Sequence, residues 1–386
     1  CSMDKPKVLF FTKINFGNQQ NAGYHSKVRA QAGALRKTGL DVDLLYFRNY
    51  ECVIESEDSE KKYPFSNRLS LLWFMFITYP ITSGAKHYQG LYIRHFLTNP
   101  LFLVMLLIYK LKKTSIVLEL PTFPYAFEYK EWNKNRLLYL IDRCCSMFFR
   151  FFISRIVTFS FDDKIYGIKT IRTDNGVEVS KIKAAQILPD FNNEFSLLGL
   201  GNPRIWHAYE RIIEGMKIFY QENPSIKVKF EIAGQGGELE KYRKLVDDYK
   251  LNKYVIFHGF QTGKNLDDLC ERSHVAVASL GMHRINVAKG EASPLKAREF
   301  AARGIPFVTA YTDKGFPVGF PYILQFSADE SPIDISKIVA FYRELRNTLP
   351  QYQTDLRQYA EDNLDWSAKM KTVADYFKQQ TKIKNT

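Results

Sequence analysis

Short apolar runs and longer amphipathic stretches alternate along the first half of the chain. The short runs have the length and composition of buried strands, and they fall at residues 6–12, 41–47, 91–94, 116–119 and 155–159. Apolar positions at helical spacing predict helices at residues 25–38, 100–111 and 136–152. A strand, a glycine-bearing loop, a helix and a strand open the chain, so a right-handed parallel βαβ crossover is expected. The charged stretch 51–67 predicts an irregular surface loop.

The second half of the chain repeats this rhythm. Strands are predicted at residues 195–200, 227–233, 255–257, 275–280 and 305–308. Helices are predicted between them and near the end, at residues 206–219, 238–249, 336–349 and from 365 onward. Alternation of this kind is typical of parallel α/β domains, and 386 residues with 46% hydrophobic content are enough for two of them.

The helix predicted after residue 292 has the most informative ends. Ser293 is a suitable N-cap, and Pro294 falls at the first helical position, where its missing N–H costs nothing. Gly304 can adopt the left-handed conformation that ends the helix. Lys296 in the first turn opposes the helix dipole, which is reasonable if an anion binds at the same place. An ordinary amphipathic helix with solvated charges fits this pattern equally well.

Two glutamates frame the start of this helix, and they support a resemblance. Glu291 and Glu299 are separated by seven residues, and the helix ends in A-A-R-G-I-P before an apolar run. This E-x7-E arrangement resembles that of the retaining GT-B glycosyltransferases of family 4. The resemblance implies that Glu291 contacts the donor sugar as a catalytic residue, that Glu299 contacts the ribose, and that the helix start with Ser293 and Lys296 holds the diphosphate.

The resemblance also implies an architecture. Two Rossmann-like parallel-sheet domains would face a cleft, with the donor on the second domain and the acceptor on the first. We expect residues 1–188, joined by a C-terminal helix at 365–386, to form the acceptor-side domain. Residues 189–364 would then bind the nucleotide sugar. Gly23, in the first glycine-bearing loop, is a further candidate for donor binding. Neither a cofactor nor a metal is expected.

The chain departs from the family pattern at three places. The family's E-G-F-G-L-P is replaced by E-A-S-P-L-K, which predicts a stiffer phosphate loop. The Arg and Lys that usually hold the diphosphate are missing, so the candidates are Arg204 and His207, with Gly201 and Asn202. His207 fits interdomain packing equally well. Glu119 stands where many members have a histidine near the reacting centre, and it would act catalytically there or cap a turn.

Charge and cysteine usage extend this hypothesis to partners and location. The net charge is +13, and residues 1–190, with 27 basic and 17 acidic side chains, account for +10 of it. A basic first half predicts peripheral contact with an anionic membrane, or a merely basic solvated surface. Motifs typical of nucleic-acid binding are absent from the sequence, so no such partner is expected. Five cysteines without metal-binding spacing favour a reducing cytoplasm. Together with the basic first half, this predicts a cytoplasmic protein with peripheral contact at the inner face of the plasma membrane.

The sequence therefore predicts a glycosyltransferase that moves a hexosyl or N-acetylhexosaminyl group with retention. The donor would be a UDP-, GDP- or ADP-sugar, and the acceptor a lipid-linked glycan or a polysaccharide. A nucleotide-sugar epimerase and a non-catalytic nucleotide-binding relative of the same fold remain alternatives.

Overall fold

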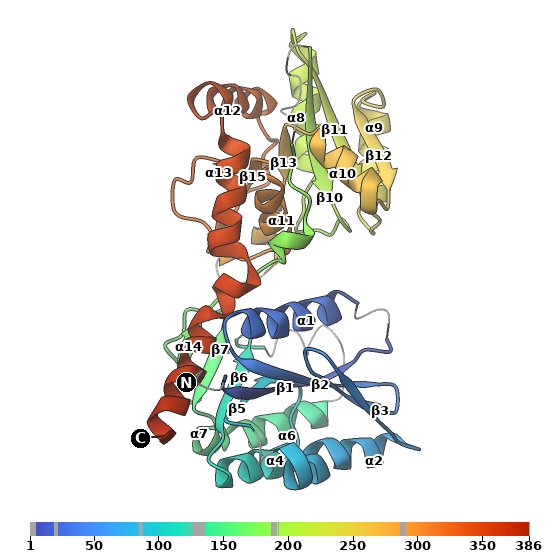
Figure 1. The fold of residues 1–386 in the computed structure, drawn as a ribbon. Helices are drawn as coiled ribbons and strands as arrows, with labels where there is room; N and C mark the ends of the chain where they lie inside the picture. Colours follow the sequence, from blue (N-terminus) through green and yellow to red (C-terminus); the bar gives the residue numbers. More distant parts are fainter. Residues whose placement is uncertain are drawn as a thin grey trace. The chain divides into compact units, whose positions relative to one another are not determined.

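The computed structural model divides the chain into two compact units (Figure 1). Unit 1 comprises residues 1–174 and 366–386, and unit 2 comprises residues 175–365. The structure describes residues 5–18, 22–84, 88–121, 123–125, 136–186, 191, 193–285 and 291–385. At residues 22–23, 83–84, 136, 291–292 and 384–385 the description covers the backbone alone.

Unit 1 is built on a nine-stranded sheet in the order β4-β3-β2-β1-β5-β6-β7-β9-β8. The parallel strands are β1 (Lys7–Asn15), β2 (Asp41–Arg48), β5 (Gly90–Arg94), β6 (Ser115–Leu120), β7 (Arg155–Thr158) and β9 (Ile168–Arg172). Antiparallel strands complete the two edges, namely β3 (Glu51–Glu55), β4 (Glu60–Pro64) and β8 (Lys164–Ile165). Strand order reverses beside β1, because β2 continues on one side and β5 on the other.

Helices cover both faces of this sheet (Figure 1). Alternate residues of β1 enter two cores, since Leu9 and Phe11 pack on one face and Val8 and Phe10 on the other. The first face carries α2 (Arg68–Trp73), η2 (Phe74–Thr78), η3 (Pro80–Gly84), α4 (Pro100–Leu111), α6 (Arg136–Ser146) and α7 (Phe149–Phe152). The second face carries α1 (Ala22–Lys37) and α14 (Trp366–Asn385). The last helix therefore belongs to the unit in which the chain begins.

Unit 2 contains a six-stranded parallel sheet in the order β12-β11-β10-β13-β15-β17. Its strands are β10 (Glu194–Leu200), β11 (Lys227–Ala233), β12 (Val255–Gly259), β13 (Val275–Val277), β15 (Phe307–Thr309) and β17 (Ile323–Gln325). The chain builds outward from β10 first through β11 and β12, and then through β13 and β15. Ligands of open α/β sheets bind at the carboxyl ends of strands beside such a reversal.

Helices and short segments of unit 2 complete its core. The helices are α8 (Glu210–Gln221), α9 (Leu239–Asp248), α10 (Gly263–Glu271), α11 (Leu295–Arg303), α12 (Ile335–Thr348) and α13 (Tyr352–Tyr359). Single turns occur at η4 (Val179–Lys181), η5 (Met282–Arg284) and η7 (Ala360–Leu364). A two-stranded parallel ladder joins β14 (Glu291–Ala292) to β16 (Thr312–Asp313). The expected α/β class with two Rossmann-like parallel-sheet domains is confirmed.

Three expectations differ from the structure. The stretch 51–67 is not an irregular loop, because Cys52, Val53 and Ile54 are buried in β3, which pairs with β2. The helix predicted at 136–152 is divided into α6 and α7. The boundary between units falls after residue 174 and not after 188. Residues 177–182 already belong to unit 2, because Val179 packs in its core and Val177 donates to the Leu364 carbonyl.

Candidate functional site

The carboxyl ends of β10, β11 and β12 are tied together in unit 2. The Gly201 amide donates to the Ala233 carbonyl over 2.8 Å, and the Gly234 amide donates to the Gly259 carbonyl over 2.7 Å. Gly201 has a φ of 87° and Gly234 a φ of 156°, where other residues are strained. A side chain at Gly234 would also overlap the Gly201 carbonyl. The two glycines therefore let these strand ends approach one another.

Helix α11 begins beside these strand ends, and its cap differs from the prediction. The cap residue is Pro294, and no side chain among the described residues makes a capping bond to this turn. The Ser293 hydroxyl instead accepts a hydrogen bond from the Asn175 amide at 3.2 Å. The Asn175 side chain donates in turn to the Ser293 carbonyl at 2.8 Å. The prediction that Ser293 caps the helix was wrong, and a helix start without a side-chain cap favours an anionic ligand.

A buried ion pair that sequence reasoning missed fixes this turn. Arg298 and Asp313 are both buried, with 2.5 Å between Nη1 and Oδ2. The Arg298 guanidinium also donates to the Pro294 and Asn175 carbonyls, each at 3.2 Å. Asp313 lies on β16, the strand that pairs with Glu291 and Ala292. The pair thus holds both the start of α11 and the strand before it. The sequence signal was slight, namely one basic residue among the apolar positions of the helix.

Lys296 reaches from the first turn of α11 to the end of β10. Its ammonium nitrogen contacts the Leu200 carbonyl and lies 2.9 Å from His207 Nε2. Among the described residues it forms no ion pair with an acid. Burial lowers the pKa of Lys296 from 10.5 to about 8, while the charge of Glu299 acts in the opposite direction. A cation held in this way favours an anionic ligand.

His207 cannot neutralise that cation. Its Nδ1 accepts a hydrogen bond from the Arg204 amide at 2.8 Å, and its Nε2 lies 2.9 Å from the Lys296 nitrogen. Burial, and then the charge of Lys296, lowers the pKa of His207 to about 3. The imidazole is therefore neutral at physiological pH. It lies beside Lys296 and supplies no charge of its own.

The other predicted donor residues lie around Lys296 at different depths. Gly201 is so close that a Cβ there would stand 2.6 Å from Lys296 Nζ. Asn202 and Arg204 are exposed in the loop after β10. Glu299 lies on α11, partly exposed, with its carboxylate 3.5 Å from Arg303 Nε. The structure thus brings Gly201, His207 and Lys296 together. The Glu291 side chain lies outside the described residues, although its backbone is in β14.

The two candidates from unit 1 have different surroundings from those predicted. Glu119 is completely buried in β6, and its carboxylate accepts from Arg94, Tyr92 and Gln31 at 3.0–3.2 Å. Both oxygens are engaged by the protein, so the structure does not support the expected catalytic role or turn cap. Gly23 lies in the first turn of α1 and not in a loop.

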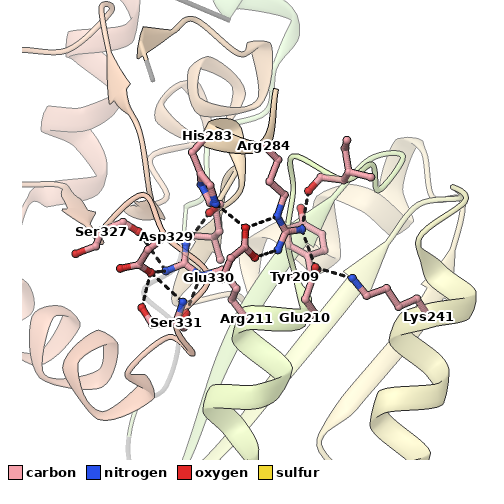
Figure 2. Close-up of polar contacts among 12 residues, drawn as sticks. Tyr209, Glu210, Arg211, Lys241, His283, Arg284, Ser327, Asp329, Glu330 and Ser331 are labelled. Atoms are coloured by element: carbon pink, nitrogen blue, oxygen red, sulfur yellow. Dashed lines mark hydrogen bonds and ion pairs between the residues drawn. The ribbon is translucent and has the colours of Figure 1, made fainter. Parts of the chain in front are cut away.

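A network of charged side chains holds further loops at the same end of unit 2 (Figure 2). Buried Arg211 donates to the Leu280, Ser327 and Ser331 carbonyls and pairs with Asp329 at 3.0 Å. Arg284 pairs with Glu330 and, at 2.7 Å, with Glu210. These contacts fix η5, the turn from which the chain runs toward β14. In the part of the chain that is described, no three His, Cys, Asp or Glu side chains gather as metal ligands.

A protein-family model matches the part of the chain that contains these residues. Residues 181–318 match the family described as "Glycosyl transferases group 1". The matched range contains Gly201, His207, Lys296 and Glu299. The described site therefore lies within the matched range.

Solved structures extend the likeness to the whole chain at the level of the fold. A glycosyltransferase from Rickettsia africae is 11% identical, with a TM-score of 0.63 over 98% of this chain and 100% of its own. Anabaena Alr3699/HepE is 13% identical, with a TM-score of 0.61 over 97% and 100%. Sucrose-phosphate synthase from Thermosynechococcus elongatus is 14% identical, with a TM-score of 0.57 over 98% and 100%. The curated sequences searched contain no match. Together these findings support a glycosyltransferase of the GT-B fold.

Proposed function

We propose that this protein transfers a sugar, with retention, from a nucleotide-diphosphate sugar to a lipid-linked or polysaccharide acceptor. The transferred group would be a hexosyl or N-acetylhexosaminyl unit. The observation that carries the proposal is Lys296, a partly buried ammonium at a helix start without a side-chain cap among the described residues, beside a neutral histidine. A diphosphate at this place would accept from the helix N–H groups and pair with that charge.

Each donor residue has a role in this proposal. Lys296 stabilises the charge that develops on the leaving diphosphate, which is the main requirement of a site without a metal. Exposed Arg204 and the backbone of Gly201 and Asn202 would approach the same phosphates from the loop after β10. Glu299 would bind the ribose and Glu291 the sugar, as the family resemblance implies.

The solved structures suggest which nucleotide to test first. Anabaena Alr3699/HepE, which shares the fold of this chain, was solved with UDP and with UDP-glucose. We therefore propose UDP as the nucleotide, with GDP and ADP as the alternatives. None of the described helices is long and apolar enough to cross a membrane. We propose a cytoplasmic location with contact at the inner membrane face, where a lipid-linked acceptor would be available.

Nucleotide binding tests the donor site directly. Thermal unfolding would be followed with UDP, GDP, ADP and their sugars, because ligands that bind only the folded state raise the apparent stability. UDP should raise the melting temperature of the wild type. Lys296→Met should weaken UDP binding by about 10- to 100-fold, since one charge-assisted contact contributes about 1.5–3 kcal/mol. Glu299→Ala should also weaken it.

The matched control for this experiment is Lys244→Met, which removes an exposed lysine of the same unit. It should bind UDP as the wild type does. Unchanged UDP binding in Lys296→Met would contradict the proposed diphosphate site.

Turnover separates the proposal from its two alternatives. A transferase releases UDP in proportion to the sugar that an acceptor receives. An epimerase would change the donor sugar without an acceptor, and a non-catalytic relative would bind UDP without either reaction.

A further inference from the structure

Helices α6 and α7 of unit 1 have their apolar side chains on the outside. Six large apolar residues of this segment are between 47% and 72% exposed, namely Leu137, Leu138, Leu140, Met147, Phe148 and Phe151. The residues that α6 buries are Asp142, Cys145 and Ser146. An ordinary surface helix has the opposite arrangement. We call these six exposed residues the α6–α7 surface.

Neighbouring helices extend this apolar character. Helices α2, α4, α6 and α7 cover the same face of the sheet (Figure 1). Helix α4 exposes Val104, Leu107 and Leu111, while α2 exposes Leu69 and Trp73. Isolated exposed apolar residues are normal, but a concentration of them on adjoining helices marks a binding surface.

The charges on these helices have one sign. Arg143 and Arg150 are exposed on α6 and α7, and Lys110 and Lys112 are exposed at the end of α4. Helices α2 and α4 contain no acidic residue, and the one on α6 and α7 is Asp142. Asp142 is buried and accepts from Thr98 at 2.6 Å and Tyr125 at 2.5 Å. Among the described residues of these four helices, the outer face holds apolar and basic side chains and no exposed acid, which complements an anionic lipid surface.

We infer that the α6–α7 surface, together with the outer face of α4, inserts into an anionic bilayer. Leucines and phenylalanines would enter the boundary between headgroups and acyl chains, and the arginines and lysines would pair with lipid phosphates. The inference deepens the proposed function and rests on it in one respect, because it places unit 1 where a lipid-linked acceptor would be found. The inward face of α6 keeps its polar contacts in this arrangement.

Vesicle co-sedimentation tests the inference with the full chain. The wild type should sediment with phosphatidylcholine vesicles that contain about a third phosphatidylglycerol. It should bind pure phosphatidylcholine more weakly by about tenfold or more, and high salt should release it, because exposed charges are screened. The triple variant Leu137→Ser, Leu140→Ser, Met147→Ser should lose at least tenfold in vesicle binding. These side chains are exposed, so their replacement leaves the core intact.

Matched controls separate this surface from general properties of the chain. Ile218→Ser, Phe260→Ser, Val318→Ser removes three exposed apolar residues of unit 2 and should bind vesicles as the wild type does. Arg143→Gln, Arg150→Gln should weaken binding to anionic vesicles about tenfold. The control Lys244→Gln, Lys264→Gln removes the same number of positive charges from unit 2 and should not weaken binding to anionic vesicles.

Three results decide the inference. Equal vesicle binding by the α6–α7 triple variant and its control would overturn it. A second result would be a wild type that binds no vesicles and is a dimer by light scattering, with the triple variant a monomer. This would overturn the inference and assign the surface to contact with a second copy of the chain. UDP-induced thermal shifts, measured on the same samples, report the donor site separately. Vesicle binding without a UDP shift would therefore support the inference while contradicting the proposed function.

Discussion

A charged side chain lies near the end of a central strand in each unit, but the two charges have opposite surroundings. Glu119 in unit 1 is completely buried, and Arg94 supplies a matching charge at 3.1 Å, with Tyr92 and Gln31 donating as well. Lys296 in unit 2 is partly buried and lies against a carbonyl and a neutral histidine, without an ion pair among the described residues. The first charge is fully satisfied by the protein, whereas the second is not.

This difference separates a charge that is satisfied within the protein from one that we propose as a ligand-binding charge. A buried carboxylate whose oxygens are all occupied cannot exchange partners without cost. A buried ammonium whose charge is unmatched gains when an anion arrives, because the anion removes the penalty that burial imposed. The sequence treated both residues as candidates for chemistry. The structure retains Lys296 and makes Glu119 a residue that positions β5, β6 and α1 through its three partners.

The largest expected effect concerns the stability of unit 1. Glu119→Gln should lower the free energy of unfolding by about 3–5 kcal/mol, because Arg94 is left buried without its counter-charge. Urea unfolding measures this, with Glu240→Gln as the control at an exposed position. Lys296→Met should not lower stability, since the charge that it removes forms no ion pair among the described residues. A Glu119→Gln protein with wild-type stability but without transfer activity would contradict this structural role and would indicate that Glu119 acts on the substrate.

The next effect is on nucleotide affinity as a function of pH. The pKa of Lys296 is about 8 in the free protein, and a bound diphosphate raises it. Affinity for UDP should therefore be highest below pH 8, where Lys296 keeps its charge, and it should fall by up to tenfold per pH unit above pH 8. Calorimetry between about pH 7.5 and 9.5 tests this, well above the second phosphate pKa of about 6.

Stability follows the opposite trend over the same range. The unfolded chain binds the Lys296 proton up to its ordinary pKa of 10.5, so it holds more protons than the folded protein between about pH 8 and 10.5. Stability in the absence of nucleotide should therefore rise with pH in this window. Lys296→Met should lack both trends, and a variant that kept the affinity slope would show that another group titrates.

The smallest effect concerns the close approach of Gly201 and Lys296. Gly201→Ala should cost about 1–2 kcal/mol of stability, because its φ of 87° strains a residue with a side chain. The new methyl group would also displace the lysine, so UDP should bind more weakly. Gly237→Ala is the control, since no atom lies within 4 Å of the added Cβ. If the two variants have the same stability and the same UDP affinity, the position of Lys296 does not depend on the absence of a side chain at residue 201.

Much of the fold could be predicted because each strand is coded locally. The bounds of β11 were predicted at 227–233 and those of α4 at 100–111, as observed, since apolar runs and helical spacing need no tertiary information. Strand β3 was missed because charged neighbours surround three buried residues, and its pairing with β2 provides the burial. Helix α6 was detected by its period, but the sequence alone did not reveal which side faces the core.

The sequence by itself determined the order of strands and helices, the two-domain class, and the presence of a lysine at the first turn of α11. These follow from local periodicity and from residues close together in the chain. Only the tertiary structure decided that Ser293 bonds to Asn175, that Arg298 pairs with Asp313, and that Glu119 is satisfied inside unit 1. Burial and hydrogen bonding depend on partners that are far apart in the chain. For that reason the surroundings of Lys296, which forms no ion pair among the described residues, could be recognised only in the folded structure.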